Sequence, residues 1–192
     1  MAIAIDDAHG IGVCGNRGRG TADAFGKTDD VDYILGTFSK SFGASGGFIA
    51  ASKAAVDELR QQSSPYMFSA SLPPAVVATV RHILGVLRKD DCRVKQLWEN
   101  IDYFRSCASD LGLPVMASDS AIFPVRVSRD EKALDCARRL VAEKGIFVLP
   151  VIYPVVPQNK ARMRVSINAG HSREDISRLA ESLAEILALG RG

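Results

Sequence analysis

The chain has 192 residues, of which 47% are hydrophobic, enough to form the core of one large or two small domains. Its 24 basic and 22 acidic residues leave a formal charge of +2, so we expect neither nucleic acid nor an anionic membrane as a partner. No apolar run reaches the roughly 18 residues of a membrane helix, and no signal-peptide pattern precedes the first strand. We therefore expect a soluble, cytoplasmic protein.

The cysteines form no CxxC motif, and their spacing indicates no disulfide pairs. Such thiols are typical of a reducing compartment, and we expect neither a disulfide framework nor a metal site. The four are Cys14, Cys92, Cys107 and Cys136.

The N-terminal part predicts strands separated by loops. Residues 1–5 are a continuous apolar run that stops at Asp6, which is typical of a buried parallel strand. A central strand with no element ahead of it lacks a pairing partner, so we expect the numbering to start inside a larger domain. The glycine-dense loop 10–20 follows. Further predicted elements are strands over 31–38 and 46–52, a helix over about 52–62 and a loop over 63–74.

The C-terminal part predicts helices and then a compact α+β unit. Apolar residues at helical spacing follow Pro74, the triplet Lys89–Asp91 interrupts them, and Ser172 opens a capping box for the last helix. The other predicted elements are helices over 92–111 and 131–144, the latter ending at Gly145, and strands over 121–127, 146–152 and 161–167. We divide the chain into a large-domain part over 1–74, connecting helices over 75–112 and a small domain over 113–192.

Lys40 lies in the loop of small residues that follows the apolar run 31–35. Lysines are rarely buried without a partner, and one that reacts with a carbonyl must be neutral, which burial or a nearby cation favours by lowering its pKa. By itself the pattern leaves two readings open: a Schiff-base lysine or a solvated loop lysine.

Two loops carry polar side chains that we expect to converge. Asp6 and His9 follow one strand, and Thr37, Ser39 and Lys40 follow another. The carboxyl ends of parallel strands open onto one crevice, so these residues would face a common ligand. A carboxylate, an imidazole, hydroxyls and an amine are the groups that pyridoxal phosphate requires.

Four ordered motifs also carry a family resemblance. They are Asp6–Gly10 with the glycines up to Gly20, Gly36–Gly43, Phe68–Pro74 and Arg162–His171. Together they resemble the α-oxoamine synthases, which are fold-type-I pyridoxal-phosphate enzymes with an α/β large domain and an α+β C-terminal domain. Members of that family are about twice as long as this chain. The resemblance therefore implies a C-terminal half, with weak or absent catalysis by these residues alone.

The resemblance implies a role for each loop residue. Lys40 would anchor the cofactor and remove the α-proton, Asp6 would pair with the ring nitrogen, and His9 would bind the ring oxygen. Thr37 would bind the cofactor phosphate, and Ser71 would reach the phosphate in the partner subunit of a homodimer with shared sites. Asp7, by contrast, is expected to be a loop or helix-capping residue.

The resemblance also separates positions that spacing cannot. Arg162 and Arg164 lie two apart on a predicted strand and face the same side. The resemblance selects Arg164 as the clamp for the substrate carboxylate. Ala70 occupies a position where family members often carry threonine, so one expected phosphate donor is absent or replaced, and Ser69 is a weaker candidate.

The implied reaction is the condensation of an amino acid with an acyl-CoA or acyl-carrier thioester, followed by decarboxylation to an aminoketone. The motifs look most like those of serine palmitoyltransferase, which favours serine, with glycine or alanine as alternatives. 8-Amino-7-oxononanoate synthase and other members share the same catalytic positions. Two other functions stay open: an aminotransferase, and a non-catalytic partner of an active subunit.

Overall fold

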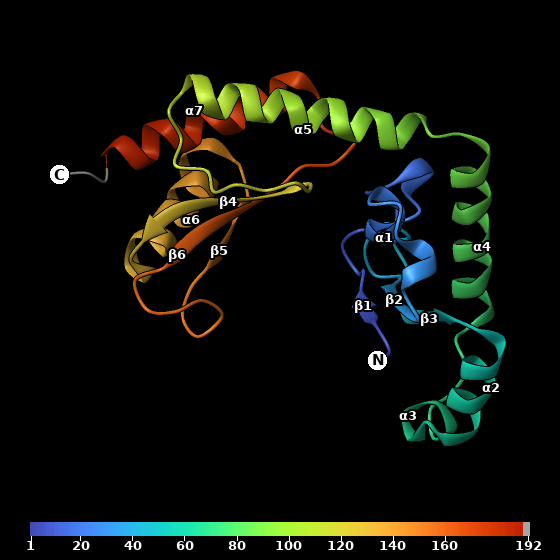
Figure 1. Ribbon diagram of the computed structural model, residues 1–192. Helices are drawn as coiled ribbons and strands as arrows, with labels where there is room; N and C mark the ends of the chain where they lie inside the picture. Colours follow the sequence, from blue (N-terminus) through green and yellow to red (C-terminus); the bar gives the residue numbers. More distant parts are fainter. Residues whose placement is uncertain (190–192) are drawn as a thin grey trace. The chain divides into compact units, whose positions relative to one another are not determined.

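The computed structural model describes residues 1–189, which fall into two compact units that divide between Val94 and Lys95 (Figure 1). Each unit has its own three-stranded sheet. None of the described helices is both long enough and apolar enough to cross a membrane. The predicted division at 74/75 and 112/113 stays a prediction.

The sheet of the first unit has the order β1 (Ala4–Asp6), β2 (Tyr33–Thr37) and β3 (Gly47–Ala51). β1 and β2 are parallel, with Asp6 paired to Leu35, so both strands end at the same edge of the sheet. β3 runs antiparallel to β2, a direction that the sequence analysis did not specify. The parallel pair is the one that positions the predicted site.

The loop between β1 and β2 contains three short elements where the sequence analysis predicted none. They are a 3-10 turn, η1 (Asn16–Gly18), the helix α1 (Thr21–Ala24) and a second 3-10 turn, η2 (Thr28–Asp30). Gly12, Gly15, Gly18 and Gly20 all adopt positive φ, which side chains other than glycine rarely tolerate. The four glycines therefore allow the backbone of this loop to turn where other residues would be strained.

Three helices complete the first unit. α2 (Lys53–Gln62) begins after Ser52, whose hydroxyl accepts from the backbone N–H of Ala55, and α4 (Pro74–Lys89) begins at Pro74 as expected. α3 (Ser64–Met67) is a single turn inside the region predicted as loop. A cluster of Phe38, Phe42 and Phe48, with ring centroids 5.5–5.6 Å from Phe38, forms part of the small core.

The second unit packs helices against an antiparallel sheet of order β4 (Ile122–Ser128), β6 (Ala161–Ser166) and β5 (Leu149–Val151). Alternate residues of β6 are fully buried, and so are residues spaced by one helical turn on the helices, because these positions form the shared core. The helices are α5 (Cys92–Asp110), α6 (Asp130–Lys144) and α7 (Arg173–Leu189).

The predicted ends of the second unit's helices are confirmed. Gly145 follows α6 in the left-handed conformation with φ 66°, as a C-capping glycine does. Ser172 and Asp175 form the capping box: the Ser172 hydroxyl accepts from the Asp175 N–H at 3.1 Å, and the Asp175 carboxylate accepts from the Ser172 N–H at 3.2 Å. β5 is shorter than predicted, because only three of its residues pair with β6.

Candidate active site

The predicted meeting of two strand ends is confirmed within the first unit. The backbone N–H of Asp7 donates to the carbonyl of Leu35 at 2.8 Å, directly beyond the paired residues of β1 and β2. Asp6 therefore ends one strand beside the strand that Thr37 ends. This edge presents a carboxylate and a hydroxyl from neighbouring strands.

Lys40 lies three residues beyond β2, in a tight turn closed by a bond from the Gly43 N–H to the Lys40 carbonyl at 2.9 Å. Before it, the hydroxyls of Thr37 and Ser39 are 2.8 Å apart, and the Ser39 N–H donates to the Thr37 hydroxyl. The side chain of Lys40 is exposed, so the described chain does not enclose the amine. The Thr37 and Ser39 hydroxyls lie together, and Lys40 follows them in the chain.

A contact that the sequence analysis missed joins the lysine loop to the glycine-rich loop. The hydroxyl of Ser41 donates to the carbonyl of Ile11 at 2.7 Å. Gly12 lies against the same serine, since a β-carbon on Gly12 would come within 2.4 Å of the Ser41 β-carbon. The small residues on both loops were the available signal: only such residues let two backbones approach this closely.

Asp6 and Asp7 have different environments despite their adjacency. Asp7 is buried, and its carboxylate accepts from the N–H of Thr21 at 2.8 Å and from the Thr21 hydroxyl at 2.5 Å. Asp7 lies in the loop after β1, as one of the two predicted roles requires, and it bonds the first residue of α1, whose N-cap residue is Gly20. Asp6 is exposed and accepts one bond, from the Ala8 N–H at 3.0 Å. Asp6 is therefore the carboxylate that a ligand can reach, and His9, also exposed, lies on the same loop.

The donor set of this edge fits pyridoxal phosphate. Thr37 and Ser39 offer hydroxyls for a phosphate, Lys40 offers the amine, and Asp6 offers a carboxylate for a protonated ring nitrogen. Ser71 is exposed in the segment between α3 and α4, and its predicted contact with a partner subunit stays a prediction.

A separate cavity of about 1030 Å³ lies beside the aromatic cluster, in the first unit. Its walls are largely apolar, with Phe38, Leu84 and Leu87 among the lining residues and Arg17 and Arg88 as cations. None of the predicted site residues lines it, so we do not assign it to the reaction.

Arg164 lies in the second unit, on the central strand β6. It is half-buried, and its side chain has neither a hydrogen bond nor an ion pair with any described residue. The neighbouring Arg162 donates from Nε to the Lys160 carbonyl at 3.2 Å. The choice of Arg164 as the carboxylate clamp stays a prediction, but its guanidinium is the less engaged of the two.

The turn after β6 is held by a buried amide that the sequence analysis missed. Asn100 on α5 is 2% exposed and donates to the carbonyls of Asn168 and His171 at 3.0 and 2.9 Å. His171 hydrogen-bonds with Asn168, which agrees with the local role expected for it. The network anchors the end of the strand that carries Arg164.

The thiols form no disulfide, and all four are free. Burial raises the pKa of the Cys14 thiol, and the negative charge of Asp7 raises it further. Burial also raises the pKa of Cys136, to about 11. Within residues 1–189 no group of three or more histidine, cysteine, aspartate or glutamate side chains is arranged to hold a metal ion.

Comparison with known proteins places these motifs in a family context. The family model described as aminotransferase class I and II matches residues 1–183. The 8-amino-7-oxononanoate synthase of Petrotoga mobilis is 44% identical over 174 residues, which are 91% of this chain and 44% of that protein. The serine palmitoyltransferase of Bacteriovorax stolpii is 43% identical over 183 residues, 95% of this chain and 43% of that protein.

A solved structure gives the same result for the fold. A serine palmitoyltransferase variant from S. paucimobilis with a bound PLP–myriocin aldimine superimposes with a TM-score of 0.91 at 30% identity, over 98% of this chain and 48% of that one. The chain thus spans less than half the length of the relatives that it matches.

Proposed function

Because the chain belongs to the aminotransferase class I and II family and, within it, to the α-oxoamine synthases, we propose that it carries the lysine-bearing half of a pyridoxal-phosphate acyltransferase site. The observation that carries this proposal is the contact between the Lys40 loop and the glycine-rich loop at the shared edge of β1 and β2. It joins the amine, the hydroxyls and the carboxylate loop in one unit.

Pyridoxal phosphate, when bound, supplies an electron sink that acidifies the α-carbon of an amino acid. Lys40 would hold the cofactor covalently through Nζ and, once released from it, would accept the α-proton at the same nitrogen. The Asp6 carboxylate would favour a protonated ring nitrogen, because a nearby anion stabilises the protonated base. His9 would donate to the ring oxygen, and Thr37 and Ser39 would donate to the phosphate.

Arg164 binds the carboxylate of the amino acid. A guanidinium offers two parallel donors to a carboxylate, which fixes the orientation of the substrate as well as its charge. Arg164 has no acidic partner among the described residues, so its donors are available.

The proposed substrates are an amino acid, with serine favoured and glycine or alanine as alternatives, and an acyl-CoA or acyl-carrier thioester. The α-carbon forms a bond to the acyl carbon, the thiol leaves, and loss of the carboxyl group as carbon dioxide gives an aminoketone. The serine palmitoyltransferase relative supports serine and a long acyl chain. We propose that two copies share their sites, with Ser71 binding the phosphate held by the partner.

The first experiment is cofactor binding by the full chain. Addition of pyridoxal phosphate should produce a visible absorbance band that is lost in Lys40→Ala and kept in Lys53→Ala, because Lys53 is an exposed lysine paired with Asp57. A band that survives in Lys40→Ala, or no band in the wild type, contradicts the assignment. We expect weak or absent turnover by these residues alone.

An aminotransferase is the second candidate, since the matching family model covers that activity as well. Release of free thiol from an acyl-CoA in the presence of serine separates the two reactions, because amino transfer releases no thiol. The non-catalytic partner is disfavoured by the presence of Lys40 and Asp6 together.

A further inference from the structure

The less buried face of the sheet formed by β4, β6 and β5 carries three arginines. Along β4 and β6, every second residue is buried. The positions between the buried residues include Arg126, Arg162 and Arg164, which therefore face the other side of the sheet. We call these three residues the arginine face. Arg126 is exposed, and the other two are half-buried.

Strand register places these charges side by side. Arg126 is paired directly opposite Arg162, and Arg164 follows two residues along the same strand. Side chains directly opposite have β-carbons about 5 Å apart, and like charges at such positions destabilise a sheet. The three strands contain no acidic residue, and the nearby Glu131 and Asp135, which line a cavity together with Arg126, form no ion pair with it.

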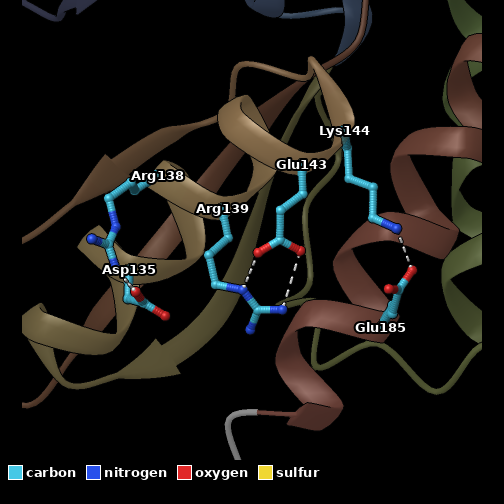
Figure 2. A network of polar contacts seen from close by, with 6 residues as sticks. All are labelled: Asp135, Arg138, Arg139, Glu143, Lys144 and Glu185. Carbon is cyan, nitrogen blue, oxygen red and sulfur yellow. Dashed lines mark hydrogen bonds and ion pairs between the residues drawn. The ribbon is translucent and has the colours of Figure 1, made fainter.

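The helical side of the same unit shows the opposite arrangement. Figure 2 shows Arg138 bound to Asp135, Arg139 to Glu143 and Lys144 to Glu185, with separations of 2.6, 2.8 and 2.7 Å. The side chains of Arg126 and Arg164 have no hydrogen bond or ion pair with a described residue, and the side chain of Arg162 bonds only a backbone carbonyl. These three helical cations therefore have carboxylate partners, whereas the side chains of the arginine face form no ion pair with a described residue.

We infer that Arg126 and Arg162 bind the phosphate groups of a coenzyme A thioester, the acyl donor of the proposed reaction. The inference rests on the proposed function, in which Arg164 on the same face binds the amino-acid carboxylate. A polyanion supplies the negative charge that the opposed arginines lack, and guanidinium binds phosphate with two parallel donors. Leu149 and Val151 on β5 pair with Arg164 and Arg162 and provide adjacent apolar surface for the pantetheine arm.

The test is calorimetric titration of the full chain with coenzyme A, without pyridoxal phosphate. The double variant Arg126→Gln/Arg162→Gln should bind coenzyme A at least about tenfold more weakly than the wild type, because each lost charged hydrogen bond costs about that much. Arg138→Gln removes a paired arginine from the same unit and should keep wild-type affinity. Circular dichroism checks that all variants are folded.

Pantetheine, which lacks the phosphates, is the second probe. Its affinity should be the same for the wild type and the double variant, and added salt should weaken coenzyme A binding only in the wild type. The inference is overturned if the wild type binds coenzyme A no better than pantetheine, or if the double variant keeps its affinity. The lysine-dependent absorbance band reports separately on the proposed function, so the two failures are distinguishable.

Discussion

Asp7 and Thr21 are joined by two hydrogen bonds, one to the backbone N–H and one to the hydroxyl of the threonine. The carboxylate is buried, and Gly10 and Gly20 pack around it so closely that a β-carbon on either would lie 2.0 or 2.2 Å from its oxygens. This pair closes the glycine-rich loop beside the site and leaves Asp6 as the accessible carboxylate.

Asp7→Ala should therefore lower the free energy of unfolding by about 2 kcal/mol, because it removes two hydrogen bonds and leaves the half-buried Thr21 donors unpaired. Urea unfolding followed by circular dichroism measures the change. Asp29→Ala, at an exposed aspartate elsewhere in the segment between β1 and β2, should change stability by less than about 0.5 kcal/mol. Equal effects of the two substitutions would show that Asp7 does not hold the loop.

Gly12→Ala should impair cofactor binding more than Gly26→Ala. Both glycines have positive φ, 80° and 62°, so both substitutions carry backbone strain of about 1 kcal/mol. Only at Gly12 does the added carbon collide with Ser41, whereas nothing lies within 4 Å of one at Gly26. Titration with pyridoxal phosphate, read from the absorbance band, should show a weaker affinity for Gly12→Ala alone. Equal affinities of the two variants for pyridoxal phosphate would show that the contact between Gly12 and Ser41 does not contribute to cofactor binding.

Stability of the second unit should fall at alkaline pH because of Cys136. Burial raises the pKa of its thiol from 9.0 to about 11, so the folded state keeps a proton that the unfolded state releases. The stabilisation is complete below pH 9 and is lost as the pH rises toward 11, by about 2 kcal/mol in all. Fluorescence of Trp98, the single tryptophan, follows unfolding at each pH. Cys136→Ala should have a flatter profile over pH 9–11; an unchanged slope would assign the loss to other groups.

Asn100→Ala should destabilise the second unit by about 2 kcal/mol, because it removes both side-chain hydrogen bonds to the carbonyls of Asn168 and His171. Asn100→Asp should cost more, since a carboxylate cannot donate and its charge faces two carbonyl oxygens. Gln96→Ala removes only the bond from Gln96 to Asn100 and serves as the milder comparison. Urea unfolding, followed by the fluorescence of Trp98, gives the order of stability of these variants. Wild-type stability of Asn100→Asp would contradict the anchoring role.

The long elements were predictable from periodicity and caps, and the short ones were not. Ser172 and Gly145 mark helix ends through local bonding that a sequence displays directly. α1 and α3 have four residues each, and a helix so short has little stability of its own. Their formation depends on contacts such as the one from Asp7 to Thr21, fourteen residues away.

The sequence by itself determined the family and predicted the reactive lysine, because four motifs in order specify residue types that one cofactor requires. Tertiary structure decided how those residues are arranged. Strand register and loop packing decide three features of the site region. They bury Asp7 and not Asp6, they bring Ser41 to the glycine-rich loop, and they place Arg126 opposite Arg162. Register is set by pairing between residues distant in the chain, and a one-residue shift would move every side chain to the other face.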